Sequence, residues 1–320
     1  MIDKGGGTGL LSTWEGLYPS LSVDGAGVSQ IGYVRDSFFG SKLNYATYVG
    51  AGGSGCSETS AWDCSTVTTS SVGTAIGGLS LDSNVSGGPA MAYYSYTYNS
   101  GTYTGSVSYA KWVGMMGSCN PSGSWQCDVI DGGSGTDIGH APVLPKAAGI
   151  MPSGRIAYYD YTNASLKFAW WYGSGTGNCG PGNSWYCLSI ERVSPNPIDH
   201  GSAMGLAMVG YSDGNFMIAY EDDDDVPGNG QLKIARVAPT TGNCGMGAFE
   251  CLTVDDGVRW RSGGLTGDTV GRSIGMALNS GSVATIAYGG VDDTTTVYSL
   301  NVAQQWLLNA LPLIERNFSN

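Results

Sequence analysis

The stretch Ile156-Ala157-Tyr158 is one copy of an apolar–small–aromatic pattern that decides the fold, because the pattern returns along the whole chain. Five copies are present, with tyrosines 60 to 68 residues apart: Ile31-Gly32-Tyr33, Met91-Ala92-Tyr93, Ile156-Ala157-Tyr158, Ile218-Ala219-Tyr220 and Ile286-Ala287-Tyr288. A repeat of this length indicates one supersecondary unit per copy, and such a unit buries its apolar face only against its neighbours.

Each copy is accompanied by three further apolar stretches. One precedes it, as in 17–24, another follows it, as in 166–169, and a third closes the unit, as in 127–130. Glycine, asparagine, aspartate and serine fill the intervals, which is typical of turns between antiparallel strands. The sequence therefore predicts an all-β fold, a β-propeller of five four-stranded antiparallel blades.

The blade boundaries follow from the repeat. We expect one propeller domain over 1–320, with blades at 17–72, 73–139, 140–201, 202–260 and 261–320, and with 1–16 closing the ring. Met1 to Gly5 resembles 129–133, where a fourth strand ends, so the chain is expected to close the ring with strands from both ends. The alternatives are a five-unit excerpt of a longer array and, for the tail 304–318, either a fourth strand or a short docked helix broken at Pro312.

The amino-acid composition argues against two classes of partner, nucleic acids and membranes. The 320 residues carry 26 acidic and 14 basic side chains, a net charge of −12, while 42% of residues are apolar. Nucleic acids are bound through lysine and arginine, so we expect no nucleic-acid partner. No segment reaches the roughly 20 apolar residues that span a bilayer, so no membrane insertion is expected.

The eight cysteines form four pairs, each between the third and fourth strands of its own blade: Cys56 and Cys64, Cys119 and Cys127, Cys179 and Cys187, Cys244 and Cys251. The spacing does not fit a zinc site. We expect one disulfide in each of four blades and an extracellular location, secreted or at the cell surface. The aromatic residues beside the second cysteines, Trp62, Trp125, Trp185 and Phe249, are interpreted as packing rather than as sugar-binding platforms.

A candidate ligand site is predicted where the repeats differ. The loops between the second and third strands, and the connections between blades, are expected on the face of the propeller opposite the disulfide hairpins. The predicted ligand-binding residues on that face are Trp14, Glu15, Asp36, His140, Asp160, His200 and Trp260. The alternative is that these are ordinary polar loop residues.

An acidic run suggests a possible calcium site. It consists of Glu221, Asp222, Asp223, Asp224 and Asp225, followed by a proline–glycine turn. Its oxygen density suits calcium, although it lacks the spacing of the twelve-residue helix–loop–helix calcium loop. The alternative is a solvated hairpin tip, and no other cofactor is expected.

The segments Ile156–Asp160 and Leu166–Ala169 resemble the repeats of secreted bacterial propeller proteins, a likeness that implies fold rather than activity. Two families of five-bladed propellers offer functions for comparison. Five-bladed glycosidases use a pair of carboxylates on either side of a sugar. Asp36, Asp160 and Glu221 are the candidates for such carboxylates in this chain. Tachylectin-like propellers bind one sugar per blade through near-identical loops, which this chain lacks.

The leading hypothesis is a secreted, non-catalytic binding or adhesion module, with no catalytic residues and with carbohydrate or another extracellular protein as partner. The alternative is a glycoside hydrolase that uses the rim carboxylates. A further alternative is a structural subunit of an extracellular assembly, for which self-association is expected.

Overall fold

The computed structural model describes residues 2–3, 13–84, 87–119, 123–147, 154–173, 175–193, 205–222, 230–238, 242–261, 264–292, 297–304 and 314–317. Their regular structure is a series of β-strands and two single-turn 3-10 helices, η2 (Pro181–Asn183) and η3 (Gly245–Gly247). Among these residues no helix is long and apolar enough to cross a membrane.

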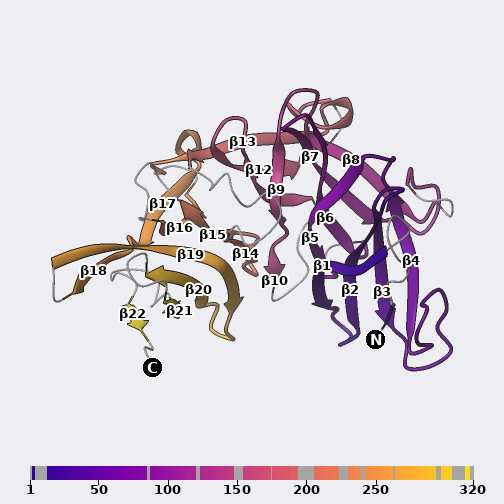
Figure 1. The fold of residues 1–320 in the computed structure, drawn as a ribbon, viewed down its shortest axis with the longest axis horizontal. Helices are drawn as coiled ribbons and strands as arrows, with labels where there is room; N and C mark the ends of the chain where they lie inside the picture. Colours follow the sequence, from indigo (N-terminus) through magenta and orange to yellow (C-terminus); the bar gives the residue numbers. More distant parts are fainter. Residues whose placement is uncertain are drawn as a thin grey trace. The chain divides into compact units, whose positions relative to one another are not determined.

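The strands form five sheets in chain order (Figure 1). The first two sheets contain β1 (Thr13–Val23), β2 (Ser29–Ser37), β3 (Lys42–Tyr48) and β4 (Trp62–Thr69), then β5 (Thr74–Asp82), β6 (Ala90–Asn99), β7 (Thr102–Trp112) and β8 (Trp125–Gly132). The third contains β9 (Ile138–Val143), β11 (Arg155–Asp160), β12 (Ser165–Trp171) and β13 (Trp185–Arg192).

The fourth and fifth sheets each carry one extra strand. The fourth contains β14 (Leu206–Gly210), β15 (Phe216–Asp222), β16 (Gln231–Val237) and β17 (Phe249–Asp255), with β10 (Lys146–Ala147) parallel to β14. The fifth contains β18 (Val258–Arg261), β19 (Gly264–Leu278), β20 (Ala284–Asp292), β21 (Tyr298–Gln304) and β22 (Ile314–Asn317). Because β22 pairs with β21, part of the C-terminal tail is a strand at the edge of this sheet.

The predicted fold class is confirmed. The described part of the chain is all-β, and its five sheets each contain the four antiparallel strands expected of a propeller blade, with one further strand in the last two. All four predicted disulfides are formed, each within one blade, and the described residues include no free cysteine. The repeat identified the second strand of every blade correctly.

The chain divides into two compact units. The first comprises Met1–Leu144, Gly149–Ile156 and Ala169–Cys187, and the second comprises Pro145–Ala148, Ala157–Phe168 and Leu188–Asn320. The first two blades lie in the first unit and the last two in the second, while the residues of the third blade are divided between them.

The small residue of each repeat is explained by packing in the core. In the first blade the position is Gly32, and a Cβ built there would lie 3.0 Å from the Leu79 side chain. In β15 all seven residues are buried, in agreement with a strand covered on both faces.

The aromatic residues beside the second cysteines are core residues in three of the four blades. Trp125, Trp185 and Phe249 are each at most 3% exposed. Their rings pack on an aromatic residue of the preceding blade, with centroids 5.3 Å apart for Trp125 on Tyr45, 5.2 Å for Trp185 on Tyr109 and 5.9 Å for Phe249 on Phe168. Trp62 is partly exposed and packs edge-on against Tyr48.

Candidate functional site

A polar pocket of about 440 Å³ opens on one face of the first blade. Strand geometry explains its composition, because residues two apart on a strand point to the same face. Tyr33 and Arg35 project into it from β2, and Lys42 and Asn44 project from β3. The remaining lining includes Glu15 from β1, Asp3 near the N-terminus and the Cys56–Cys64 hairpin. Its volume is within the range of small-molecule sites.

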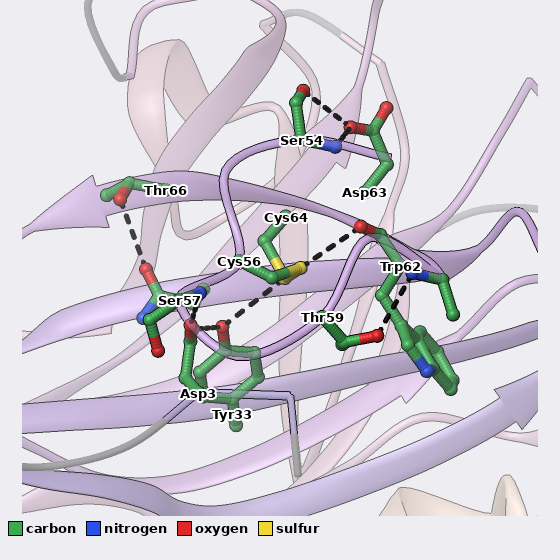
Figure 2. Close-up of a disulfide and its surroundings, with 12 residues drawn as sticks. Asp3, Tyr33, Ser54, Cys56, Ser57, Thr59, Trp62, Asp63, Cys64 and Thr66 are labelled. Carbon is green, nitrogen blue, oxygen red and sulfur yellow. Dashed lines mark hydrogen bonds between the residues drawn. A yellow bond between two sulfur atoms is a disulfide. The ribbon is translucent and has the colours of Figure 1, made fainter. Parts of the chain in front are cut away.

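Asp3 is held in the pocket by neutral hydrogen-bond donors (Figure 2). The hydroxyl of Tyr33 donates to Oδ2 of Asp3, and the amide of Ser57 donates to Oδ1 at 2.7 Å. Burial by itself raises the pKa of the Asp3 carboxyl, but these hydrogen bonds prevail and hold it below its ordinary value of 3.8. Asp3 is therefore ionised across the usual pH range.

Glu15 has the opposite electrostatic character. Its side chain is only 7% exposed, and Oε1 lies 2.9 Å from Nε of Arg35. Burial raises the pKa of the Glu15 carboxyl above its ordinary value of 4.5, with Arg35 opposing the shift and Asp3 adding to it. The second oxygen, Oε2, is buried and has no hydrogen-bond partner among the residues that the structure describes. That oxygen is the natural place for a proton.

The contact between Asp3 and Tyr33 has a counterpart elsewhere in the repeat, so it is partly architectural. In the fifth blade the hydroxyl of Tyr288 donates to Oδ2 of Asp255 at 2.8 Å. There the guanidinium of Arg259 also binds both carboxylate oxygens, at 2.6 and 2.9 Å. Asp3 receives neutral donors in place of this bidentate cation, so its negative charge is less compensated.

The pocket thus contains two carboxylates whose pKa values are shifted in opposite directions, which is the usual arrangement of an acid and a base in one site. Arg35 and Lys42 supply positive charge beside them. Asn44 adds a polar group and accepts a hydrogen bond from the Thr66 hydroxyl at 3.1 Å. The arrangement is suited to proton transfer on an uncharged, hydroxyl-rich substrate.

Of the predicted ligand residues, Glu15 is in this pocket, whereas Trp14 and Asp36 are not. Trp14 and Glu15 belong to β1 rather than to a connection between blades, and successive strand residues point to opposite faces. Trp14 is 63% exposed and is not part of the pocket lining. Asp36 belongs to β2 rather than to a loop, and it accepts a hydrogen bond from the Ser41 hydroxyl at 2.7 Å.

His140 and Asp160 are buried strand residues, whereas the sequence pattern predicted them in a loop or a connection between blades. His140 is 2% exposed in β9, with Nε2 2.8 Å from Oδ1 of Asp137 and its ring against Tyr94. Asp160 is fully buried at the end of β11. It accepts hydrogen bonds from the backbone and side chain of Asn163 at 2.9 and 2.8 Å, and it lies 3.5 Å from Nζ of Lys167.

The other predicted residues are placed only in part. His200, Asp223, Asp224 and Asp225 lie outside the described residues, and for Trp260 the structure describes only the backbone, in β18.

The first two residues of the acidic run are strand residues rather than hairpin-tip residues. Glu221 and Asp222 are buried in β15, and Asp222 lies 2.8 Å from Nζ of Lys233. Within the described residues, no group of three or more His, Cys, Asp or Glu side chains is arranged to hold a metal ion. The calcium site stays a prediction.

The site reasoning from sequence missed Asp3, Tyr33 and Lys42. A usable signal was present, because the N-terminal segment was recognised as similar to the end of a fourth strand. The acidic residue at that point of a blade meets the repeat tyrosine, as Asp255 meets Tyr288. The expected site also lay on the face opposite the disulfide hairpins, whereas this pocket is lined by one of them.

No protein-family model matches the sequence, and no curated protein matches it. Solved structures show a distant likeness. The endo-arabinase of Bacteroides thetaiotaomicron is 10% identical, with 95% of this chain and 81% of that chain covered and a TM-score of 0.39. The xylan β-1,4-xylosidase of Bacillus halodurans is 11% identical (92% and 53% covered, TM-score 0.43). The endo-1,5-α-L-arabinanase of Thermotoga petrophila is 13% identical (96% and 75% covered, TM-score 0.35).

These neighbours correct the leading functional hypothesis. All three are described as enzymes that act on glycans, so the expectation of a secreted, non-catalytic binding or adhesion module is withdrawn in favour of the hydrolase alternative. At such low identity and with TM-scores below 0.5, the likeness assigns no activity to this chain.

Proposed function

We propose that this chain is a glycoside hydrolase whose reaction takes place in the pocket of Asp3 and Glu15. The observation that supports the proposal is the opposite displacement of the two carboxyl pKa values in one pocket. Glycoside hydrolysis needs one carboxylic acid that is protonated and one carboxylate that is ionised, on either side of the bond that is cut. The four disulfides support an extracellular setting, where polysaccharides are found.

Glu15 is the general acid in this proposal. Its protonated carboxyl gives the proton to the glycosidic oxygen as the bond to the anomeric carbon breaks, and the leaving sugar departs as an alcohol. Glu15 is then an anion, and Arg35, 2.9 Å from its Oε1, stabilises that charge. The buried oxygen Oε2 has no hydrogen-bond partner among the described residues, so no donor there opposes its protonation.

Asp3 is the ionised partner. Either it removes a proton from the water that attacks the anomeric carbon, or it attacks that carbon itself and is released by water in a second step. The Tyr33 hydroxyl and the Ser57 amide keep it in the charged form that both routes require. The configuration of the first product, measured by NMR, distinguishes the routes, because the first inverts the anomeric centre and the second retains it.

The test is hydrolysis of neutral polysaccharides and of aryl glycosides. Arabinan and xylan are suitable first polymers. We expect Glu15→Gln and Asp3→Asn each to lower kcat/KM by about 100-fold or more, the size of a lost general acid or base. Glu250→Gln is a matched control, because Glu250 is ion-paired with Arg236 in the second unit and leaves the pocket untouched.

The pH dependence provides a second test. The rate is expected to fall as pH drops through the Asp3 pKa, below 3.8, because the base becomes protonated, and to fall as pH rises through the Glu15 pKa, above 4.5, because the acid loses its proton. An acidic optimum follows. Wild-type protein that releases no reducing sugar from any neutral glycan, or full activity in Glu15→Gln, would overturn the proposal.

A further inference from the structure

A second pocket, of about 500 Å³, lies beside the first one in the same unit. It is formed by the first two blades. Tyr45 and Thr47 of β3 and Asp63 of β4 line it from the first blade, and Trp112 at the end of β7 lines it from the second. Thr47 and Asp63 are cross-strand partners, so their side chains share one face of the sheet.

The aromatic wall of this second pocket is supported by packing and by a backbone hydrogen bond. Trp112 is 36% exposed, and its ring packs edge-on against the buried ring of Trp125 at 5.5 Å. Trp125 packs in the same way against Tyr45 at 5.3 Å. The amide of Trp112 is also fixed by a hydrogen bond to the Pro89 carbonyl at 2.9 Å. A half-exposed tryptophan supported from behind is suited to stacking against a flat apolar ligand face.

The polar groups of the second pocket favour an uncharged partner. Thr47, Ser65 and Ser124 can donate or accept hydrogen bonds, and Asp63 can accept them. Hydrogen bonds from the amide and hydroxyl of Ser54, both 2.9 Å, hold the pKa of the Asp63 carboxyl below its ordinary value. Among the described residues that line the pocket there is no lysine or arginine, so an anionic sugar has no counter-charge there.

The two pockets lie on either side of one structural element, the Cys56–Cys64 hairpin. Cys64 and Ser65 line both of them, whereas Ser54 lines the second pocket and Ser57 lines the first. In Figure 2 the disulfide lies between the Ser54–Asp63 contact and the Asp3–Tyr33 contact. Tyr45 and Thr47 point to the opposite face of the sheet from Lys42 and Asn44, so a glycan that occupies both pockets passes around the edge strand β4 at this hairpin.

We propose that the second pocket is a sugar-binding subsite that holds a neutral residue of a polysaccharide, stacked on Trp112, while another part of the same chain lies between Asp3 and Glu15. This inference rests on the proposed function and makes it more specific, because it identifies the substrate as a polymer rather than a small glycoside. Trp112 and Asp63 are positioning residues in this scheme, and they take no part in bond cleavage.

The experiment compares Trp112→Ala with a matched tryptophan. Trp171 occupies the corresponding place at the end of β12, is 56% exposed, and is not among the residues lining the second pocket. Binding of arabinan and xylan is measured by affinity gel electrophoresis, and the hydrolysis of each polymer is compared with that of an aryl glycoside. We expect Trp112→Ala to weaken polymer binding about tenfold and to lower the ratio of polymer to aryl-glycoside cleavage, with Trp171→Ala as wild type.

Further measurements separate the two proposals and exclude misfolding. Trp112→Phe keeps an aromatic face and should recover most of the binding, while circular dichroism checks that both variants are folded. If polymer binding depends on Trp112 but no hydrolysis occurs, the subsite stands and the proposed reaction falls. If the polymer is cut and Trp112→Ala binds and cuts it like the wild type, the subsite is wrong and the reaction stands.

Discussion

The hydroxyl of Tyr33 is expected to stabilise the fold chiefly by keeping Asp3 ionised, and Tyr33→Phe removes it while preserving the ring. A hydrogen bond to a charged group contributes about 1.5–3 kcal/mol. We therefore expect this loss of unfolding free energy at pH 7. Without this donor, the pKa of the Asp3 carboxyl should rise.

The sign of the pH dependence follows from the lowered pKa of Asp3. A carboxyl whose pKa is lower in the folded state adds stability above its unfolded value, here 3.8, and this contribution is lost as pH falls through the folded value. The difference between wild type and Tyr33→Phe should therefore be largest near neutral pH and shrink below pH 3.8. Urea unfolding at a series of pH values measures the difference in unfolding free energy between the two proteins and its dependence on pH.

Tyr288→Phe is the matched control for this experiment. Tyr288 makes the corresponding contact to Asp255, but Arg259 binds both oxygens of that carboxylate and holds it ionised without the tyrosine. The loss of unfolding free energy in Tyr288→Phe should be smaller than in Tyr33→Phe and nearly independent of pH above 3.8. A Tyr33→Phe variant with the same stability difference at pH 7 and pH 3 would refute the reasoning, because the hydroxyl would then act independently of the Asp3 charge.

Two further predictions concern stability. Lys233→Met should lose about 3–5 kcal/mol, because it removes the ammonium that is ion-paired with the buried Asp222 and with Glu191. Burial alone lowers the pKa of Lys233, but these carboxylates raise it above 10.5. The ion-pair contribution to stability is therefore present below that pH and is lost as pH rises through the folded-state pKa. An equal loss of stability in Lys167→Met, whose ammonium lies 3.5 Å from the Asp160 carboxylate, would contradict this prediction. Trp125→Ala should cost about 3–5 kcal/mol by leaving a cavity, in contrast to the exposed Trp171→Ala, and chemical denaturation that ranks them equally would disprove a core role.

The blade architecture could be predicted from the sequence because it depends on local patterns of residue types that recur in every blade. The apolar–small–aromatic strands recur at one spacing, and burial on both faces of β15 is what such a strand requires. The disulfides were equally accessible, since Cys119 and Cys127 occupy the same place in their blade as Cys179 and Cys187 in the next. A pattern repeated in every blade constrains the fold strongly and the function weakly.

The site was harder to predict because residues that differ between the repeats were expected in loops and connections between blades. Asp160 and His140 are polar, yet both are buried, and hydrogen bonds to Asn163 and Asp137 respectively satisfy them inside the blades. Asp3 and Tyr33 are thirty residues apart in the sequence, so no local sequence spacing predicts their contact. Only the likeness between the N-terminal segment and the end of a fourth strand pointed to it.

The hairpin between the two pockets shows how a departure from the repeat can create a site. In the other disulfide blades the residue before the first cysteine caps the hairpin with its side chain. Ser118 binds the backbone of Cys127, and Asn178 and Asn243 make the corresponding contacts one and two blades later.

The first blade has Gly55 at that place, and a Cβ there would lie 2.1 Å from the carbonyl oxygen of Cys64, so no capping side chain fits. Carboxylates take over the task from both sides. Asp63 binds the amide and hydroxyl of Ser54, and Asp3 accepts the amide of Ser57. Each of these two carboxylates lines one of the two pockets, so the hairpin without a side-chain cap has an acidic group on either side.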